Sequence, residues 1–293
     1  MAMLKKQKKK VNLYVIACLV VLSVYVLLLL YLIFYGAMTS LKTRLEFSDN
    51  RLGLPIMPTM ENYLKVLQYY KVYSKTLDRV IYIDEMMAYS LLYAGGCAFM
   101  QTLCCMLVGY ATSKFNYKFN GVLTAFVIIA LNLPIVGNLP STLVIFKAFN
   151  LNDNLVGVWI SKFYFISVYF MVFRAAFKSI SPAYSEAAKI DGAGNLKVFL
   201  SIMIPLIKGT FTTIFLLLFV VYWNDYGTPL MLLPSYPTIS LGLYYYRFRS
   251  SAKTQDTPSQ LAGCLTAFIP ILIIFILFRN KLMGNVTMGG LKE

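Results

Sequence analysis

Long apolar runs recur along the chain and predict its architecture. Each is close to the ~20 residues that a helix needs to cross a ~30 Å hydrocarbon core. Membrane-spanning strands need about half that length and alternate strictly between apolar and polar residues, which these runs do not do. We therefore predict an all-α integral membrane protein with six transmembrane helices. The six runs are residues 13–38, 86–113, 119–146, 155–173, 209–233 and 261–278.

The composition agrees with this class and disfavours several others. Of the 293 residues, 59% are hydrophobic, and the mean hydropathy of +0.67 is too high for a soluble domain. The formal net charge of +15 would suggest nucleic acid in a soluble protein, but here it fits cytoplasmic loops that face anionic lipid. The chain has no histidine, so it lacks the commonest metal ligand and cannot form a Ser-His-Asp triad. No catalytic, metal or cofactor site is predicted.

Lysine and arginine near the span ends predict the orientation. Five lysines place the basic segment 1–12 in the cytoplasm, and six spans return the tail 282–293 to the same side. Residues 39–85 are then extracytoplasmic, and we expect them to pack as short helices. The run 13–38 follows basic residues as a signal peptide would, but it is too long for one and is interpreted as a retained anchor. The remaining spans form a core over residues 86–281.

One long polar, helix-forming segment, residues 178–208, separates the fourth span from the fifth. A Ser-Pro pair suits the cap and first turn of a helix over 182–191, which Gly192 would end. A second helix is predicted over 195–203, ended by Pro205. The result is a helix-turn-helix lying flat at the cytoplasmic face. The alternative is an amphipathic helix that only rests on the membrane surface.

In this segment Glu186-Ala187-Ala188 is followed by Asp191-Gly192 and later by an Ile-Pro pair. The spacing resembles the cytoplasmic EAA loop of permease subunits of ATP-binding-cassette (ABC) importers. The resemblance implies that this loop sits in a cleft of a separate ATPase subunit and switches the pathway between inward- and outward-facing states when the ATPase closes. The implied coupling residues are Glu186, Ala187, Ala188, Asp191 and Gly192.

The resemblance covers essentially the whole chain, least well over residues 39–85, and it is greatest to the second permease partner of maltose-type and oligosaccharide importers. That family usually has Asn where this chain has Tyr89, and its C-terminal tail ends in Gly, where this chain has Glu293. The similar segments are Tyr89-Ser90-Leu91, Gly109-Tyr110-Ala111, Trp223-Asn224-Asp225 and the Gly-rich stretch 281–292.

The resemblance also implies partners. A homologous second permease would complete a heterodimer, and an extracytoplasmic solute-binding protein would deliver a carbohydrate. A pair of ATPase subunits would bind ATP and Mg²⁺, so this chain would itself be neither an enzyme nor a cofactor-binding protein. Its place would be a bacterial cytoplasmic (inner) membrane.

Charged and amide side chains within the spans are candidates for solute contact. Asp225 and Lys162 are charges at membrane depth, which usually line a pathway or pair with each other. For Asp225 the alternative is a structural hydrogen bond between helices, and for Lys162 it is a side chain that reaches toward the membrane surface. Sugars are bound by aromatic faces together with amide and carboxylate groups. The candidate pathway residues are Asn132, Asn138, Trp223, Asn224, Asp225 and Tyr226.

Two alternatives to a carbohydrate importer stay open at this point. The same type of importer could carry another solute, such as a polyamine or a phosphorylated compound, which would require a clearly charged cavity. A membrane-embedded enzyme or scaffold would require a cluster of intramembrane Asp, Ser or metal ligands, and the sequence contains none.

Overall fold

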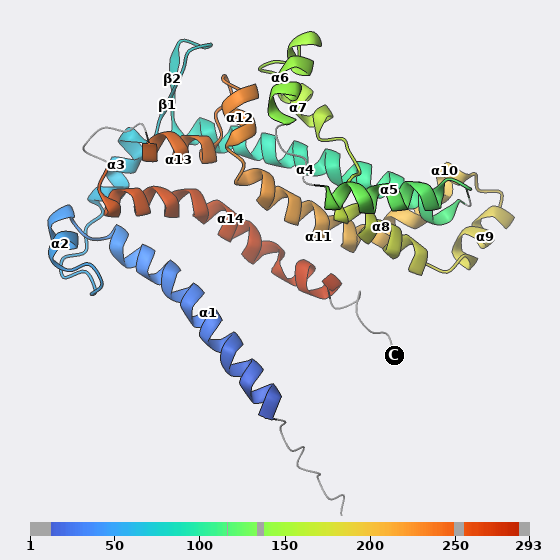
Figure 1. Cartoon of the computed structure of the whole chain (residues 1–293), viewed down its shortest axis with the longest axis horizontal. Coiled ribbons are helices and arrows are strands. Elements are labelled where there is room, and N and C mark those ends of the chain that lie inside the picture. The colour runs from blue at the N-terminus through green and yellow to red at the C-terminus, as the bar shows by residue number, and fades with distance from the viewer. Residues whose placement is uncertain (1–12, 116, 134–137, 249–254, 287–293) are drawn as a thin grey trace, which may run out of the picture. The chain divides into compact units, whose positions relative to one another are not determined.

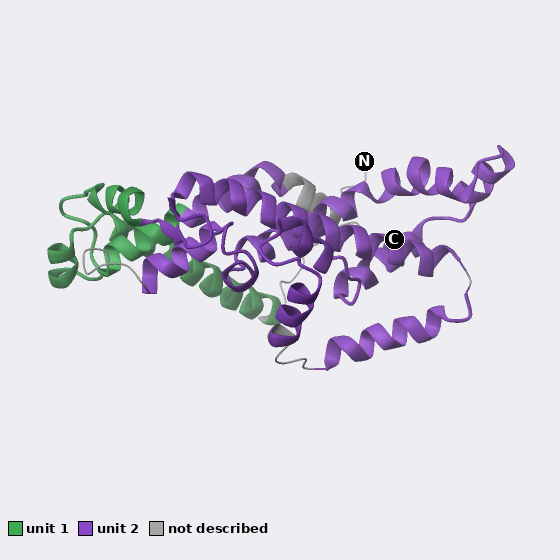
Figure 2. Ribbon diagram, turned by 90° about the horizontal axis from the view of Figure 1, so that it is seen from above, with its two compact units in different colours: residues 1–69, 250–266 green, residues 70–249, 267–293 purple. Residues whose placement is uncertain are grey.

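A computed structural model shows a chain built almost entirely of helices (Figure 1). It describes residues 13–115, 117–133, 138–248 and 255–286, without the side chains of residues 13, 138–139 and 280–286. The predicted basic segment 1–12 and residues 287–293 of the predicted tail lie outside the described residues. The all-α prediction is confirmed. The described part forms two compact units, which Figure 2 distinguishes by colour.

The first unit comprises residues 1–69 and 250–266. Its elements are α1 (Leu13–Ser40), α2 (Arg44–Asp49), α3 (Glu61–Tyr69) and the start of α14 (Thr257–Val286). The helix α1 is apolar on all sides and is exposed to its surroundings along most of its length, as expected of a helix in lipid.

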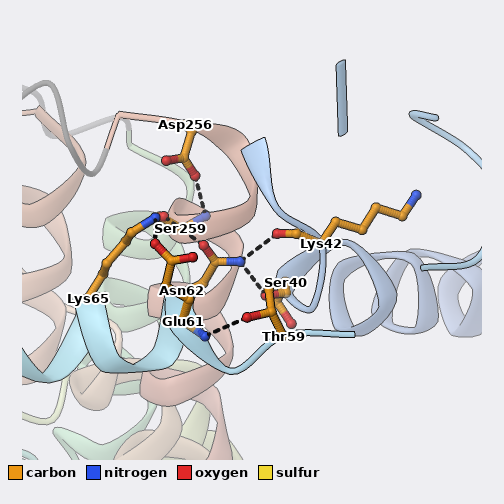
Figure 3. Close-up of polar contacts among 8 residues, drawn as sticks. All are labelled: Ser40, Lys42, Thr59, Glu61, Asn62, Lys65, Asp256 and Ser259. Atoms are coloured by element: carbon orange, nitrogen blue, oxygen red, sulfur yellow. Dashed lines mark hydrogen bonds and ion pairs between the residues drawn. The ribbon is translucent and has the colours of Figure 1, made fainter. Parts of the chain in front are cut away.

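The buried side-chain amide of Asn62 links three helices of the first unit. The side chain of Asn62, in α3, donates hydrogen bonds to the carbonyls of Ser40 and Lys42 at 2.8 and 2.7 Å (Figure 3). Its Oδ1 accepts a hydrogen bond from Ser259 at 3.1 Å. The end of α1, the start of α3 and the first turn of α14 therefore meet at one polar side chain.

The second unit comprises residues 70–249 and 267–293. The long helix α4 (Ile83–Lys114) packs against α8 (Val168–Ser179) and α11 (Ile204–Trp223). Gly109 permits a close crossing of α4 and α8, because a Cβ there would lie 2.8 Å from Cβ of Phe173. The elements before the polar loop are β1 (Val72–Ser74), β2 (Arg79–Ile81), α4, α5 (Asn120–Asn132), α6 (Asn138–Ala148), α7 (Leu155–Ser161) and α8 (Val168–Ser179). Those that follow are α9 (Ala183–Ile190), α10 (Asn195–Val198), a π-helical turn (Phe199–Met203), α11 (Ile204–Trp223), α12 (Gly227–Leu232) and α13 (Ile239–Phe248), before α14.

Four helices of the described residues are long and apolar enough to span a membrane: Tyr14–Ser40, Ile83–Lys114, Asn195–Trp223 and Thr257–Arg279. They correspond to the first, second, fifth and sixth predicted spans. The predicted third span is divided into α5 and α6. The predicted fourth span is not one continuous helix, because α7 and α8 are separated at residues 162–167. A count of six crossings therefore stays a prediction.

Pro205 does not end the second loop helix, contrary to the sequence prediction. The chain passes from α10 through the π-helical turn directly into α11, where Pro205 lies in the first turn. The amide of Ile204 bonds to the carbonyl of Phe199, five residues earlier. A proline lacks an amide hydrogen and clashes with the carbonyl four residues before it. A change to i→i−5 bonding just ahead of the proline explains how the helix continues.

The segment 39–85 holds the expected short helices and also a hairpin. Strands β1 and β2 pair antiparallel, with Tyr73 opposite Val80. At its tip the Tyr73 hydroxyl donates to Asp78, which raises the pKa of Tyr73. Beside it, Arg79 pairs with Glu85 at 2.7 Å. The hairpin was not predicted.

Candidate functional site

The short helix α9 holds three of the five predicted coupling residues and is uncovered. None of its eight residues is buried. At its start the Ser181 hydroxyl accepts a hydrogen bond from the amide of Ala183 at 3.3 Å, and Pro182 has helical dihedral angles. The predicted helix over 182–191 therefore agrees closely with α9.

The end of α9 is built around Gly192. The amide of Gly192 bonds to the carbonyl of Lys189 at 3.0 Å, and the amide of Ala193 bonds to that of Ala188 at 2.9 Å. These two bonds form a Schellman motif, whose C′ residue must be left-handed. Gly192 has φ +79°, which side-chain-bearing residues rarely adopt. The predicted stop at Gly192 is confirmed.

The surface of this loop offers both charge and apolar area. Glu186 is exposed, and in the described part of the chain its carboxylate has no ion pair or hydrogen bond. Nearby apolar side chains are exposed as well, with Ile190 at 86% and Leu196 at 70%. A short helix with free polar and apolar groups on its surface has the character of a docking surface rather than of a core element.

An aromatic cluster connects the loop to the long helices. Tyr110 of α4 lies 4.5 Å from the Phe199 ring and 5.2 Å from the Phe177 ring of α8, centroid to centroid. Lys114, at the end of α4, donates to the carbonyl of Ile180 at 2.7 Å, so it caps the end of α8. Both ends of the loop are thus fastened to the same end of α4. Phe199 lies within the predicted polar segment 178–208, but its contact with Tyr110 was not predicted, and nothing in the sequence pattern distinguished Phe177 from other core aromatics.

The helix break between α11 and α12 contains three of the predicted pathway residues. The half-buried Asp225 accepts a hydrogen bond from the hydroxyl of Tyr93 at 2.7 Å and from the amide of Thr228 at 3.1 Å. It therefore caps α12 and joins the break to α4. This geometry fits the interpretation of Asp225 as a structural hydrogen-bond acceptor between helices. The same carboxylate can make these bonds and also contact a solute.

The sequence neighbours of Asp225 differ in how far their side chains are exposed. Trp223 is 1% exposed, and its indole donates to the carbonyl of Ala267 at 3.4 Å, which makes it a core residue. Asn224 is exposed and donates to the carbonyl of Val220 one turn earlier. Tyr226 is 46% exposed and stacks face to face on Tyr244, with centroids 5.0 Å apart.

Lys162 and Asp225 are connected by two tyrosines rather than by an ion pair. The Lys162 ammonium lies 5.3 Å from the centroid of the Tyr222 ring. Tyr222 donates to Gln101 at 2.7 Å and meets the ring of Tyr93 edge-on, with centroids 6.3 Å apart. A chain of polar and aromatic groups therefore runs across α4 and α11 between the two charges.

The two asparagines of the predicted third span are less informative. Asn132 is exposed and donates to the carbonyl of Ile128. No contact within the described residues joins it to the 224–226 break. The side chain of Asn138 lies outside the described residues.

Comparison with a family model gives one match. The model of the binding-protein-dependent transport system inner membrane component matches residues 104–284, which is more than half of the chain. The matched region includes α9, the aromatic cluster and the break.

Three curated relatives have permease names. The probable ABC transporter permease protein MG189 homolog of Mycoplasma pneumoniae is 30% identical over 123 residues, which cover 39% of each chain. The probable starch degradation products transport system permease protein AmyC of Thermoanaerobacterium thermosulfurigenes is 24% identical over 87% of this chain and 88% of its own. The sn-glycerol-3-phosphate transport system permease protein UgpE of Yersinia pestis is 26% identical over 62% of this chain and 65% of its own. The chain thus spans less than two thirds of two of these relatives and most of AmyC.

A solved structure has the same fold. One chain in the crystal structure of a bacterial ABC transporter involved in the import of the acidic polysaccharide alginate superposes with a TM-score of 0.74. The sequences are 21% identical, and the alignment covers 96% of this chain and 99% of that one.

Proposed function

The chain belongs to the binding-protein-dependent transport system inner membrane components, and from this premise we propose that it forms half of the translocation pathway of an ATP-driven carbohydrate importer. Members of this family are transport subunits of the membrane and not enzymes. The single observation that carries the proposal is the uncovered helix α9, which is capped at both ends and is flanked by Ile180 and Phe199, two residues that contact α4.

We propose that α9 docks in a cleft of an ATPase subunit. Glu186 supplies a carboxylate that has no partner within the described residues, and Ala187 and Ala188 allow a close approach. Asp191 and Gly192 fix the direction in which the chain leaves the helix. ATP binding would close the ATPase pair and carry α9 with it. Tyr110 and Lys114 would pass this displacement to α4, so that an event at the ATPase biases a two-state pathway.

The proposed solute is a carbohydrate, and an oligosaccharide in particular. The name of AmyC and the alginate importer support this class. In the chain itself, the stacked pair Tyr226–Tyr244 offers aromatic surface, and the exposed amide of Asn224 comes two residues before Tyr226 in the sequence. Aromatic faces and amides are groups that suit a sugar ring. Trp223 is left out of the proposed pathway because it is buried.

A phosphorylated solute is the second candidate. The name of UgpE favours it, and so does Lys162, whose ammonium has no carboxylate partner within the described residues. A solute phosphate would pair with this ammonium. A neutral sugar would leave it resting on the Tyr222 ring.

The proposed partners follow from the proposed function. They are a homologous second permease, an ATPase dimer that binds ATP and Mg²⁺, and an extracytoplasmic solute-binding protein. We propose that both termini lie in the cytoplasm, as the basic segment 1–12 predicts.

Co-purification tests this proposal. The tagged chain, extracted in mild detergent, should bring down a second six-span subunit and an ATPase. The purified complex, with its binding protein, should then hydrolyse ATP faster in the presence of an oligosaccharide than of glycerol 3-phosphate. Recovery of the chain alone, under conditions that keep another membrane complex intact, would overturn the proposal. Stimulation by glycerol 3-phosphate alone would mean that the solute is a phosphorylated compound and not a carbohydrate. The proposed coupling role of α9 would then be unchanged.

A further inference from the structure

The first unit presents an apolar loop, residues 51–58, between α2 and α3. We propose that this apolar loop binds the surface of the lipid bilayer at the Ser40 end of α1, the extracytoplasmic leaflet in the predicted topology. The inference does not depend on the coupling role of α9.

The apolar loop exposes large aliphatic side chains. Leu52, Ile56 and Met57 are each 76% or 77% exposed, and Leu54 is 65% exposed. Exposed apolar residues scattered over a surface are ordinary, but four within six consecutive positions concentrate apolar surface in one loop, which is typical of an interaction site.

The apolar loop has a fixed backbone rather than a loose one. The ammonium of Lys42, which is fully buried, donates to the carbonyls of Asn50 and Gly53 at 2.7 and 2.6 Å. The Asn50 side chain accepts from the amide of Gly53 and donates to the carbonyl of Leu54. A carboxylate oxygen of Glu46 accepts from the amide of Ile56 at 2.5 Å. Backbone groups satisfied in this way lower the cost of approaching an apolar phase.

Lys42 also holds the apolar loop close to the end of α1. Lys42 comes two residues after the end of α1 and holds residues 50 and 53 within the reach of its own side chain. Asn62 in turn fixes the carbonyls of Ser40 and Lys42 (Figure 3). In Figure 1 the trace that follows α2 turns back toward the side on which α1 lies. The apolar loop is therefore placed where α1 leaves the membrane.

Lipid fits this surface better than a protein does. The exposed apolar side chains of the loop are three aliphatic groups and the thioether of Met57, and none is a Trp or Tyr, residues in which the hot spots of protein interfaces are enriched. They lie in the same unit as α1, whose side chains over residues 14–34 are exposed and largely apolar. Arg51 is exposed directly before Leu52 in the sequence, and its guanidinium can pair with a lipid phosphate.

Photo-cross-linking tests the proposal on the full complex. Benzoylphenylalanine is placed at Ile56, and at Leu28 of α1 as a lipid-facing reference, in vesicles of phosphatidylethanolamine and phosphatidylglycerol. Irradiation should add the mass of one phospholipid at both positions. A Leu52→Asp/Leu54→Asp double variant should lower the lipid adduct at Ile56 by about fivefold or more and leave the Leu28 adduct unchanged, because carboxylates oppose insertion. The Leu28 adduct also reports that the variant is still inserted.

Two results would overturn the proposal. One is an adduct at Ile56 with the second permease or the binding protein in place of lipid. The other is a lipid adduct at Leu28 with none at Ile56.

Discussion

The helix α9 and the break at residues 224–226 both interrupt a series of long apolar helices, yet they differ in whether their carboxylates are hydrogen-bonded. In α9 the carboxylate of Glu186 is exposed and unpaired within the described residues. In the break the carboxylate of Asp225 accepts two hydrogen bonds from the chain itself. A group that is left free is available to a partner, and a group that is satisfied internally holds the protein together. Mutations should therefore separate the two regions by their effects on coupling and on stability.

Gly192→Asp should have the largest effect. An L residue at φ +79° is strained by roughly 1–2 kcal/mol, so solute-stimulated ATP hydrolysis should fall about tenfold or more while the complex stays assembled. Gly194→Asp is the matched control, because Gly194 has φ −69° and open space around it. It should stay within about twofold of the parent rate. Normal stimulation with Gly192→Asp would remove α9 from the coupling path.

Asp225→Ala should lower stability rather than coupling. It leaves the buried Tyr93 hydroxyl without its acceptor, which costs about 1–3 kcal/mol and should lower the apparent Tm in detergent. Asp225→Asn keeps an acceptor oxygen and should recover most of the loss. An unchanged Tm together with lost solute stimulation would mean that Asp225 contacts the solute instead.

Lys114→Met should weaken the link between the loop and α4. It removes the hydrogen bond to the carbonyl of Ile180, a loss of about 1 kcal/mol that should reduce solute-stimulated hydrolysis about fivefold at unchanged basal hydrolysis. Lys118→Met changes an exposed lysine of the neighbouring loop and serves as the control. Equal effects of the two substitutions would indicate a general charge effect.

Tyr226→Ala should have the smallest effect and act on solute affinity. Loss of the stacked ring is worth about 1 kcal/mol, so the solute concentration for half-maximal stimulation should rise several-fold. Tyr226→Phe keeps the stack and should resemble the parent. An Ala variant with unchanged concentration dependence would exclude this tyrosine from the pathway.

The elements that local chemistry dictates were predictable from the sequence. Uniform apolarity predicted α1 and α4, and the Ser-Pro start and Gly192 end predicted α9 almost to the residue. The π-helical turn before Pro205 was not predictable, because it depends on how the loop helix joins α11 rather than on any residue type.

Features set by residues far apart in sequence were also missed. The bond from Tyr93 to Asp225 joins residues 132 positions apart, and the cluster of Tyr110, Phe177 and Phe199 unites three separate elements. A chain so rich in aromatics gives no local sign of which rings will meet. Trp223 shows the converse, because its neighbours suggested solute contact and packing buried it.

Hydrogen exchange of the assembled complex, compared with the permease pair alone, tests the central claim most directly. The uncovered α9 should exchange fast without the ATPase and about tenfold or more slowly with it, while peptides over 224–232 should not change. Equal exchange over residues 183–193 with and without bound ATPase would contradict the account, because α9 would then not be the surface that the ATPase covers.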